Sequence, residues 1–232
     1  MIIDSHVHLW NPARGDYGWM PKGDPVLDRA YRPSDLAPIL DRHGVSRVVL
    51  VQAAPTVEET DYMLGLADGW ADGGDRVAGV VGWVDFEDRS HRRHLERFAA
   101  HPKVVGVRPM IQDIADLAWM HRPDIVWAFD AMAELGIVFD ALGYPVHVPG
   151  FLDLFQRHPT LKIVVDHGAK PRIRDVKANP KAFTTWASDI GRIARETGAA
   201  CKLSGLATEA AAGFADEELE PFARHILDVF GP

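Results

Sequence analysis

The chain has 232 residues, of which 47% are hydrophobic and 25% charged, and its formal net charge is −8 at pH 7. This is the composition of a globular protein with a sizeable core, and its scattered lysines and arginines argue against nucleic acid or anionic membrane as a partner. The single cysteine, Cys201, excludes an internal disulfide. We see no basic, apolar leader and no long apolar run, so we expect a cytoplasmic protein without a membrane segment.

Short apolar runs alternate along the chain with segments of helical periodicity. We expect seven strands, at Met1–His6, Arg47–Gln52, Val77–Val84, Val104–Pro109, Ile137–Leu142, Leu161–His167 and Ala200–Ser204. Each is apolar and is followed by a helix, which indicates an α/β fold with a parallel sheet covered by helices. The strand count leaves two architectures open, a (β/α)8 TIM-like barrel that lacks its eighth strand and an open, doubly wound sheet.

The expected helices fill the intervals between these strands. They are Asp35–His43, a helix from Glu58 that Gly69 or Gly73 closes, Ser90–Ala100, Asp124–Leu135, Pro149–Arg157, Lys181–Glu196 and Asp216–Phe230. For the first of them, Ser34 is expected to supply the N-cap and Gly44 to end the helix.

A long loop, residues 10 to 33, follows the first strand on the side where barrel enzymes build their sites. Its aromatic residues are Trp10, Tyr17, Trp19 and Tyr31. An aromatic lid over a site and an ordinary surface loop explain this composition equally well.

The first strand ends in two histidines separated by one residue, His6 and His8. Because side chains alternate between the faces of a strand, Asp4, His6 and His8 are expected on one face. Two imidazoles in that arrangement can share a divalent metal ion or bind an anionic transition state. The alternative, a coincidental pair near the chain terminus, is weakened by the polar residues at the other strand ends.

Most other unusual polar or aromatic residues lie at or just after the ends of predicted strands. In chain order they are Gln52, Trp83, Asp85, Arg108, Gln112, Asp140, Asp166, His167 and Ser204. The carboxyl ends of parallel strands in a barrel meet at one rim, so we expect these side chains to gather there.

Three of these residues, His167, Arg108 and Asp140, carry groups suited to catalysis. In a regular strand Asp166 and His167 face opposite sides, and we expect His167 to point inward, where Gly168 leaves room. His167 is then either a site residue or a structural histidine. Arg108 can bind a carboxylate, stabilise an oxyanion or form a salt bridge across the barrel mouth. Asp140 can orient a histidine, bind a hydroxyl or cap a helix.

Other signatures of catalysis are absent or weak. The sequence has no serine nucleophile elbow and no glycine-rich phosphate loop, so we expect attack by water and no organic cofactor. Cys201 fits a small core residue better than a nucleophile. The histidines of the predicted helices and their ends are expected to be solvated or capping; they are His43, His91, His94, His101, His121, His158 and His225.

Five segments that occur in order over essentially the whole chain resemble a known family. They are IDSHVHLW at 3–10, VGWVD at 81–85, VGVRPMIQD at 105–113, VDHGAKP at 165–171 and KLSGL at 202–206. Together they resemble the amidohydrolase superfamily, in its amidohydrolase-2 branch, and within it the sugar-acid lactonases of the L-fuconolactonase and L-rhamnonolactonase type. The resemblance implies a distorted (β/α)8 barrel that hydrolyses a lactone ester.

The resemblance also implies roles for individual residues. His6 and His8 would match the first-strand histidine pair and would bind one divalent metal ion, zinc or manganese, although the branch also contains metal-independent lactonases. His167 would match the histidine of a later strand, and Arg108 would contact the substrate. We further expect Trp10 and Trp83 to stack on the sugar. The remaining expected substrate contacts are Gln112, Lys170 and Ser204.

The chain departs from the family pattern at its C-terminal end. Family members continue after a Phe-Gly stretch into an eighth strand with a Gly-Ser-Asp-Trp-like motif, whose aspartate is the usual metal ligand and general base. The sequence stops at Pro232, before that motif. We expect a single, C-terminally truncated amidohydrolase-like barrel domain over residues 1–232, with open strand edges that favour homo-oligomers. Asp140 and Asp85 remain as candidates for the base.

The expected activity is hydrolysis of a small lactone, most consistent with a sugar-acid lactone of carbohydrate metabolism, by activated water. Two alternatives from the same branch are a 2-pyrone-4,6-dicarboxylate lactonase and a metal-dependent decarboxylase. An inactive fragment or a sugar-acid binding scaffold is the non-enzymatic alternative.

Overall fold

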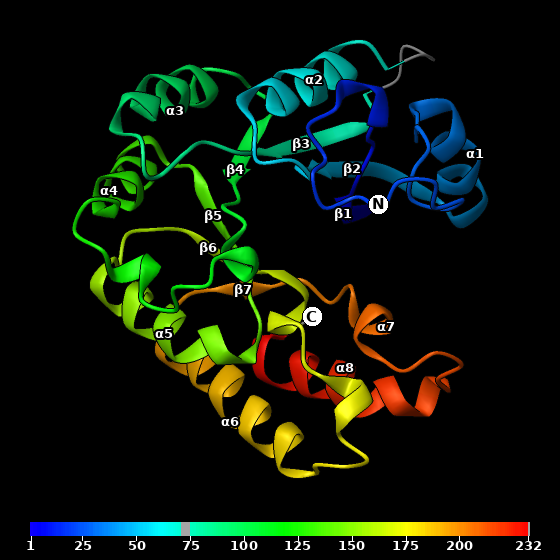
Figure 1. Ribbon diagram of the computed structural model, residues 1–232, viewed down its shortest axis with the longest axis vertical. Coiled ribbons are helices and arrows are strands. Elements are labelled where there is room, and N and C mark those ends of the chain that lie inside the picture. The colour runs from blue at the N-terminus through cyan, green and yellow to red at the C-terminus, as the bar shows by residue number, and fades with distance from the viewer. Residues whose placement is uncertain (71–74, 232) are drawn as a thin grey trace. The chain divides into compact units, whose positions relative to one another are not determined.

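A computed structural model describes residues 1–70 and 75–231, and it consists of two compact units. The first unit runs from Met1 to Arg108 and the second from Pro109 onward. Both units are built from parallel strands and helices, as the alternation of apolar runs and helical segments predicts (Figure 1). Each unit is described separately below.

The first unit contains four parallel strands in chain order. They are β1 (Ile2–Val7), β2 (Val45–Val51), β3 (Val77–Gly82) and β4 (Val104–Val107). The central strands β2 and β3 are the most deeply buried, because valine and leucine side chains line both of their faces. The pairing of β1 with β2 is irregular between Asp4 and Val7, and His6 lies in this irregular part.

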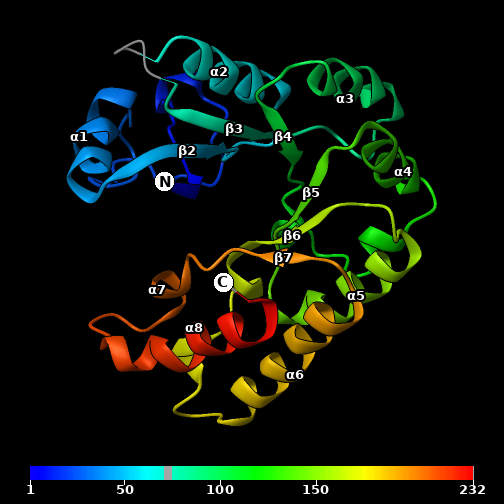
Figure 2. The ribbon, with the colours of Figure 1, turned by 180° about the vertical axis from the view of Figure 1, so that it is seen from behind.

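Three helices cover the strands of the first unit. They are α1 (Pro33–His43), which packs on β2, α2 (Val57–Asp68), which packs on β3, and α3 (Arg92–Ala99), which packs on β4 (Figure 2). Gly44 ends α1 in the left-handed conformation, as predicted. Gly69 follows α2, and Gly73, the alternative end, lies outside the described residues.

The predicted cap of α1 is wrong. Ser34 lies inside the helix, which begins at Pro33, and Arg32 occupies the N-cap position. The Asp35 carboxylate accepts a hydrogen bond of 2.9 Å from the Arg32 backbone N–H. Proline at the first helical position has its φ angle preset for a helix, so the helix can begin before the serine.

The second unit contains three parallel strands, also in chain order. They are β5 (Val138–Ala141), β6 (Ile163–Val165) and β7 (Ala200–Cys201). The sequence predicted longer strands for β6 and β7. The chain instead leaves β6 after Val165 in a tight turn over Asp166–Ala169, and β7 pairs with β6 over only two residues.

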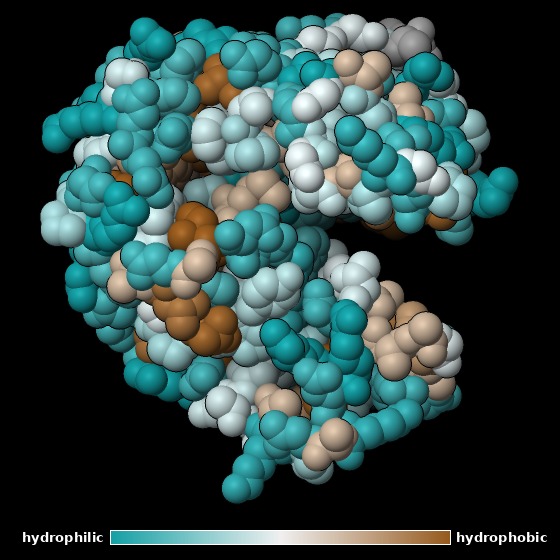
Figure 3. Space-filling model, viewed as in Figure 1, coloured by the Kyte–Doolittle hydropathy of each residue, from teal (hydrophilic) through white to brown (hydrophobic). Residues whose placement is uncertain are grey.

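The helices of the second unit are α4 (Val126–Leu135), α5 (Val148–Arg157), α6 (Lys181–Glu196), α7 (Leu206–Glu209) and α8 (Asp216–Phe230). Helix α4 packs on β5, α6 packs between α5 and α8, and α8 also contacts β7. Short α7 was not predicted. The outer helical surfaces visible in Figure 3 are mainly hydrophilic, with scattered apolar patches, as expected for helices that bury one face.

Candidate active site

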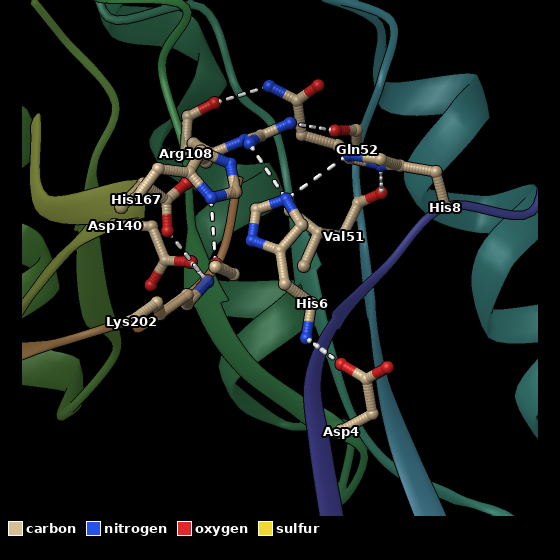
Figure 4. Close-up of polar contacts among 11 residues, drawn as sticks. Asp4, His6, His8, Val51, Gln52, Arg108, Asp140, His167 and Lys202 are labelled. Carbon is tan, nitrogen blue, oxygen red and sulfur yellow. Dashed lines mark hydrogen bonds and ion pairs between the residues drawn. The ribbon is translucent and has the colours of Figure 1, made fainter. Parts of the chain in front are cut away.

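Each unit carries a cluster of polar side chains at the carboxyl ends of its strands (Figure 4). In the first unit, the Nε2 atoms of His6 and His8 lie 3.2 Å apart. Nδ1 of His8 lies 2.8 Å from the Val51 carbonyl oxygen, so this nitrogen carries the proton and Nε2 keeps its lone pair. Both imidazoles therefore face one another, as the alternation of a strand predicts. The Asp4 carboxylate accepts a hydrogen bond from the His6 backbone N–H instead.

Arg108 joins the histidine pair from the end of β4. Its guanidinium is buried, with one nitrogen 3.3 Å from Nε2 of His6 and another bonded to the Gln52 carbonyl oxygen. The Gln52 side-chain amide in turn donates a 2.6 Å hydrogen bond to the Arg108 carbonyl oxygen. Reciprocal bonds with Gln52 thus fix both the backbone and the side chain of Arg108.

The long loop after β1 places its aromatic rings beside the histidines. The Trp10 ring stacks on His8 at a centroid distance of 5.9 Å. Trp19 and Tyr31 each meet the Trp10 ring edge-on at 5.5 Å. The Trp10 indole N–H is bonded to loop carbonyls of Leu27 and Arg29, so its orientation is fixed within the loop. These rings form an ordered aromatic wall of the first unit.

A buried carboxylate, Glu59 of α2, anchors this loop to the end of β2. Its Oε2 accepts hydrogen bonds from the backbone N–H groups of Ala53 (2.8 Å) and Ala54 (2.6 Å). Tyr17 packs against these two alanines, and the Trp19 indole donates a 2.6 Å hydrogen bond to the Ala53 carbonyl oxygen. Burial raises the pKa of Glu59, against the lowering effect of its hydrogen bonds.

Glu59 was not among the predicted site residues, although a signal for it exists. Thr56 and Glu59 have capping-box spacing, and the Thr56 hydroxyl does accept the Glu59 backbone N–H at 3.1 Å. The same hydroxyl donates to the Asp16 carboxylate at 2.8 Å, and Asp16 pairs with Arg14. The helix cap therefore also holds the loop.

Trp83 and Asp85, predicted on a common face after β3, have different contacts. The half-buried Trp83 ring lies edge-on to His91, 6.1 Å between centroids. The Asp85 carboxylate accepts the Glu87 backbone N–H, and its own N–H donates to Nδ1 of His91. Asp85 thus stabilises the turn that leads to α3.

The second unit centres on a lysine between two aspartates. Nζ of Lys202 lies 2.5 Å from Asp140 and 2.8 Å from Asp166. All three side chains are buried, with Asp166 fully covered. Lys202 follows β7, Asp140 lies near the end of β5 and Asp166 follows β6, so the Lys202 ammonium links the ends of three strands. Lys202 was missed as a site residue because lysine is rarely buried and its position in sequence is that of an exposed strand end.

His167, expected to point inward, is buried, and so is Asp166, whereas a regular strand would place the two on opposite faces. The prediction assumed a regular strand, but β6 ends at Val165 and the chain turns. Asp166 then reaches Lys202, and Nδ1 of His167 lies 2.8 Å from the Ser204 hydroxyl. Because of this turn, the adjacent side chains of Asp166 and His167 contact different residues, Lys202 and Ser204.

Lys170, directly after this turn, contacts Gln112, which lies 58 residues earlier in the sequence. Nζ of Lys170 donates a 2.5 Å hydrogen bond to Oε1 of Gln112 and lies 5.5 Å from the centroid of the Tyr144 ring. The structure thus brings together two residues that were predicted separately as substrate contacts.

Cys201 and His147 lie in apolar surroundings that keep them neutral. Burial raises the pKa of the Cys201 thiol to about 12, so it is not a thiolate at pH 7. Burial also lowers the pKa of His147, whose Nδ1 accepts the Tyr144 backbone N–H. Among the helix histidines, His121 lies 3.4 Å from Asp153 and His158 lies 3.2 Å from Asp130.

Residues 3–232 match the family model described as Amidohydrolase. The chain belongs to the amidohydrolase family. This amidohydrolase is 39% identical over 229 residues to the L-fucono-1,5-lactonase of Burkholderia ambifaria, and the match covers 99% of this chain and 76% of the relative. The family resemblance inferred from five sequence segments is thereby confirmed.

Solved structures of an amidohydrolase from Burkholderia multivorans resemble the chain over its full length. One, with bound HEPES, is 30% identical with a TM-score of 0.90, and covers 100% of this chain and 81% of that one. Another, with bound zinc, is 31% identical with a TM-score of 0.87 and the same coverage. The fold is accordingly the α/β barrel type of amidohydrolases rather than an open sheet, and residues 1–70 and 75–231 of this amidohydrolase hold seven of its strands without an eighth.

None of the described helices is long and apolar enough to cross a membrane.

Proposed function

We propose that this amidohydrolase opens the ester of a sugar-acid 1,5-lactone, with L-fucono-1,5-lactone and its stereochemical relatives as first candidates. The observation that carries the proposal is the hydrogen-bonded pair of His167 and Ser204, set beside the buried Lys202 cluster at the strand ends of the second unit. Two L-fucono-1,5-lactonases, 39% and 31% identical over 99% of the chain, support the substrate class. A small-molecule lactone is therefore the partner.

His167 is the proposed proton carrier. When Nδ1–H donates to the Ser204 hydroxyl, Nε2 is the unprotonated ring nitrogen and takes the proton of the attacking water. The water oxygen then bonds to the lactone carbonyl carbon. As the bond from that carbon to the ring oxygen breaks, His167 returns the proton to the ring oxygen. The product is an open hydroxy acid, which releases one proton at neutral pH.

Arg108 and Asp140 have the two other roles in this proposal. The buried Arg108 guanidinium of the first unit has the charge to stabilise an oxyanion. Asp140, 2% exposed and paired with Lys202, keeps the Lys202 ammonium in place. The proton transfer is assigned to His167 because the Asp140 carboxylate is already bound to an ammonium.

Each unit carries groups that suit a sugar ligand. Stacking on the Trp10 and Trp83 rings suits the apolar face of a pyranose, because both rings are only partly buried. Gln112, Lys170 and Ser204 offer donors and acceptors for hydroxyl groups.

A divalent metal ion fits the histidine pair of the first unit. The two Nε2 atoms lie 3.2 Å apart, and the bond from Nδ1 of His8 to the Val51 carbonyl fixes the tautomer that metal-binding histidines use. His6 and His8 would hold the ion, and zinc or manganese bound there would supply Lewis-acid polarisation of a carbonyl. Arg108, 3.3 Å from His6, places a positive charge beside the same pair, so the two imidazoles would hold the ion against this repulsion.

The proposal is tested with a panel of aldono-1,5-lactones, including L-fucono-1,5-lactone, in a weakly buffered assay at neutral pH that follows acid release. Assays with and without added zinc or manganese address the metal. We expect lactone opening by the wild type, and His167→Asn to lower kcat by about a hundredfold or more. His158→Asn, on the C-terminal end of α5, is the matched control and should leave kcat unchanged. Release of carbon dioxide from a carboxylated aromatic acid, without any lactone opening, would favour the decarboxylase instead.

A further inference from the structure

The turn that carries His167 has an unusual backbone. Four consecutive residues have positive φ angles: His167 (54°), Gly168 (57°), Ala169 (57°) and Lys170 (49°). Only one of them is glycine, and the left-handed region is unfavourable for the other three because of their Cβ atoms. The Lys170 backbone N–H closes the turn with a 2.9 Å hydrogen bond to the His167 carbonyl oxygen. These four residues are called the left-handed turn below.

A left-handed turn of this kind persists only where its surroundings hold it. The holding contacts here converge on Gly168. Its carbonyl oxygen accepts a 2.7 Å hydrogen bond from the indole N–H of Trp186. A Cβ atom at Gly168 would lie 2.7 Å from Cδ1 of Ile226, so the turn is also in close contact with α8.

Trp186 is itself firmly held within the second unit. Its side chain is 1% exposed, and its ring packs against Phe222 at 5.1 Å and His225 at 5.4 Å between centroids. The ring has aromatic neighbours on more than one side, Phe183 among them, so the indole N–H stays at the Gly168 carbonyl when one neighbour is made smaller. Helix α6 in this way sets the conformation of a turn that lies at the end of β6.

The left-handed turn determines where two polar side chains point. His167 is the first residue of the turn and its imidazole contacts the Ser204 hydroxyl. Lys170 is the last residue and its ammonium group donates to the Gln112 side chain. In an ordinary right-handed turn the side chains of residues 167 and 170 would leave the backbone in other directions, and these two contacts would be lost. We propose that Trp186 is a positioning residue for lactone opening: its hydrogen bond to Gly168 keeps the left-handed turn that orients His167 and Lys170. The inference rests on the proposed function for its catalytic consequence, but its structural part can be measured without substrate.

The first test compares Trp186→Phe with Phe222→Leu. Trp186→Phe removes the N–H donor and keeps an aromatic ring, whereas Phe222→Leu loosens the same aromatic cluster and keeps the hydrogen bond. We expect Trp186→Phe to lower kcat by about tenfold or more, with a smaller rise in KM, because His167 is displaced from its working position. Phe222→Leu should stay within about twofold of the wild-type kcat, even if both variants unfold at a similar, lower temperature. Equal kcat values for the two variants would overturn the proposal.

The second test reads the turn directly by NMR. The Cα and Cβ chemical shifts and the HN–Hα couplings of His167, Ala169 and Lys170 report the sign of φ in the free protein. We expect them to move toward right-handed values in Trp186→Phe and to stay at wild-type values in Phe222→Leu. Unchanged shifts in Trp186→Phe would refute the role of Trp186, whether or not any lactone is a substrate.

A third variant displaces the turn while Trp186 stays intact, so it tests the role of the turn independently of the indole. Gly168→Ala brings a methyl group against Cδ1 of Ile226 and should displace the turn, lowering kcat by a similar factor. Adding Ile226→Val removes that Cδ1 atom and should restore part of the lost kcat. If the wild type opens no lactone but Trp186→Phe still shows the shift changes described above, the proposed function fails and the positioning role of Trp186 stands.

Discussion

Lys202 and Asp140 form a buried ion pair, with 2.5 Å between Nζ and Oδ2. The second aspartate, Asp166, shares the same ammonium at 2.8 Å. The cluster holds two carboxylates and one cation, and none of the three side chains is more than 8% exposed. Removing the cation would leave two carboxylates buried close to one another.

Lys202→Met should therefore be strongly destabilising. Breaking a buried ion pair from one side costs about 3–5 kcal/mol, because the remaining charge is not compensated. Urea unfolding followed by circular dichroism measures the change. Lys162→Met, an exposed lysine at the start of β6, is the matched control and should change the free energy of unfolding by less than about 0.5 kcal/mol. A loss below about 1 kcal/mol for Lys202→Met would mean that the ammonium contributes little net stabilisation.

Ala169→Gly tests the backbone strain of the left-handed turn by its effect on stability. Ala169 is fully buried, so loss of its methyl group costs about 0.8 kcal/mol, but relief of a positive φ returns about 1–2 kcal/mol. We therefore expect Ala169→Gly to raise the free energy of unfolding slightly, by about 0.2–1.2 kcal/mol. Ala131→Gly in α4, equally buried, should cost about 2 kcal/mol, because there the glycine also weakens a helix. Similar losses for the two variants would show that the turn carries no strain.

Glu59 should make the stability of the protein depend on pH. Burial raises the pKa of Glu59 in the folded state, so the folded protein retains a proton that the unfolded chain has released. The free energy of unfolding therefore falls as pH rises from the ordinary glutamate pKa through the raised one. Glu59→Gln cannot titrate, so its stability relative to the wild type should improve across that range. A flat difference between Glu59→Gln and the wild type across that range would contradict the expected sign.

Zinc binding should depend on the histidine pair of the first unit. His8→Ala removes one Nε2 donor, and we expect zinc affinity, measured by calorimetric titration, to fall by about a hundredfold or more. His43→Ala, at the exposed end of α1, is the control for a histidine elsewhere on the surface. Full retention of zinc by His8→Ala would exclude His8 as a principal ligand.

The sequence predicts the strands of the first unit well because valine-rich runs such as that of β2 are bounded by polar residues. It also predicts that His6 and His8 face one another, since this follows from the alternation of a strand alone. The end of β6 is different. The rule of alternation holds only while the strand continues, and nothing in the run before Asp166 shows that the chain turns there.

The supporting residues of the site were harder to find than those with evident chemistry. Glu59 and Lys202 are charged residues whose usual place is the surface, and their burial depends on partners far away in sequence. The hydrogen bond from Trp186 to Gly168 spans 18 residues and joins a helix to a turn. Periodicity places Trp186 on the buried face of α6, but it cannot predict what the indole N–H contacts.

The first unit ends at Arg108, so its residues are all synthesised before those of the second unit, and this affects when the polar cluster can form. His6, His8, Gln52 and Arg108 all belong to the first 108 residues, and their mutual hydrogen bonds use no later part of the chain. Once these residues have left the ribosome, the cluster can assemble while residues after Pro109 are still being translated. The buried Arg108 guanidinium and the half-buried imidazoles of His6 and His8 would then be paired early, before the rest of the polypeptide has been synthesised.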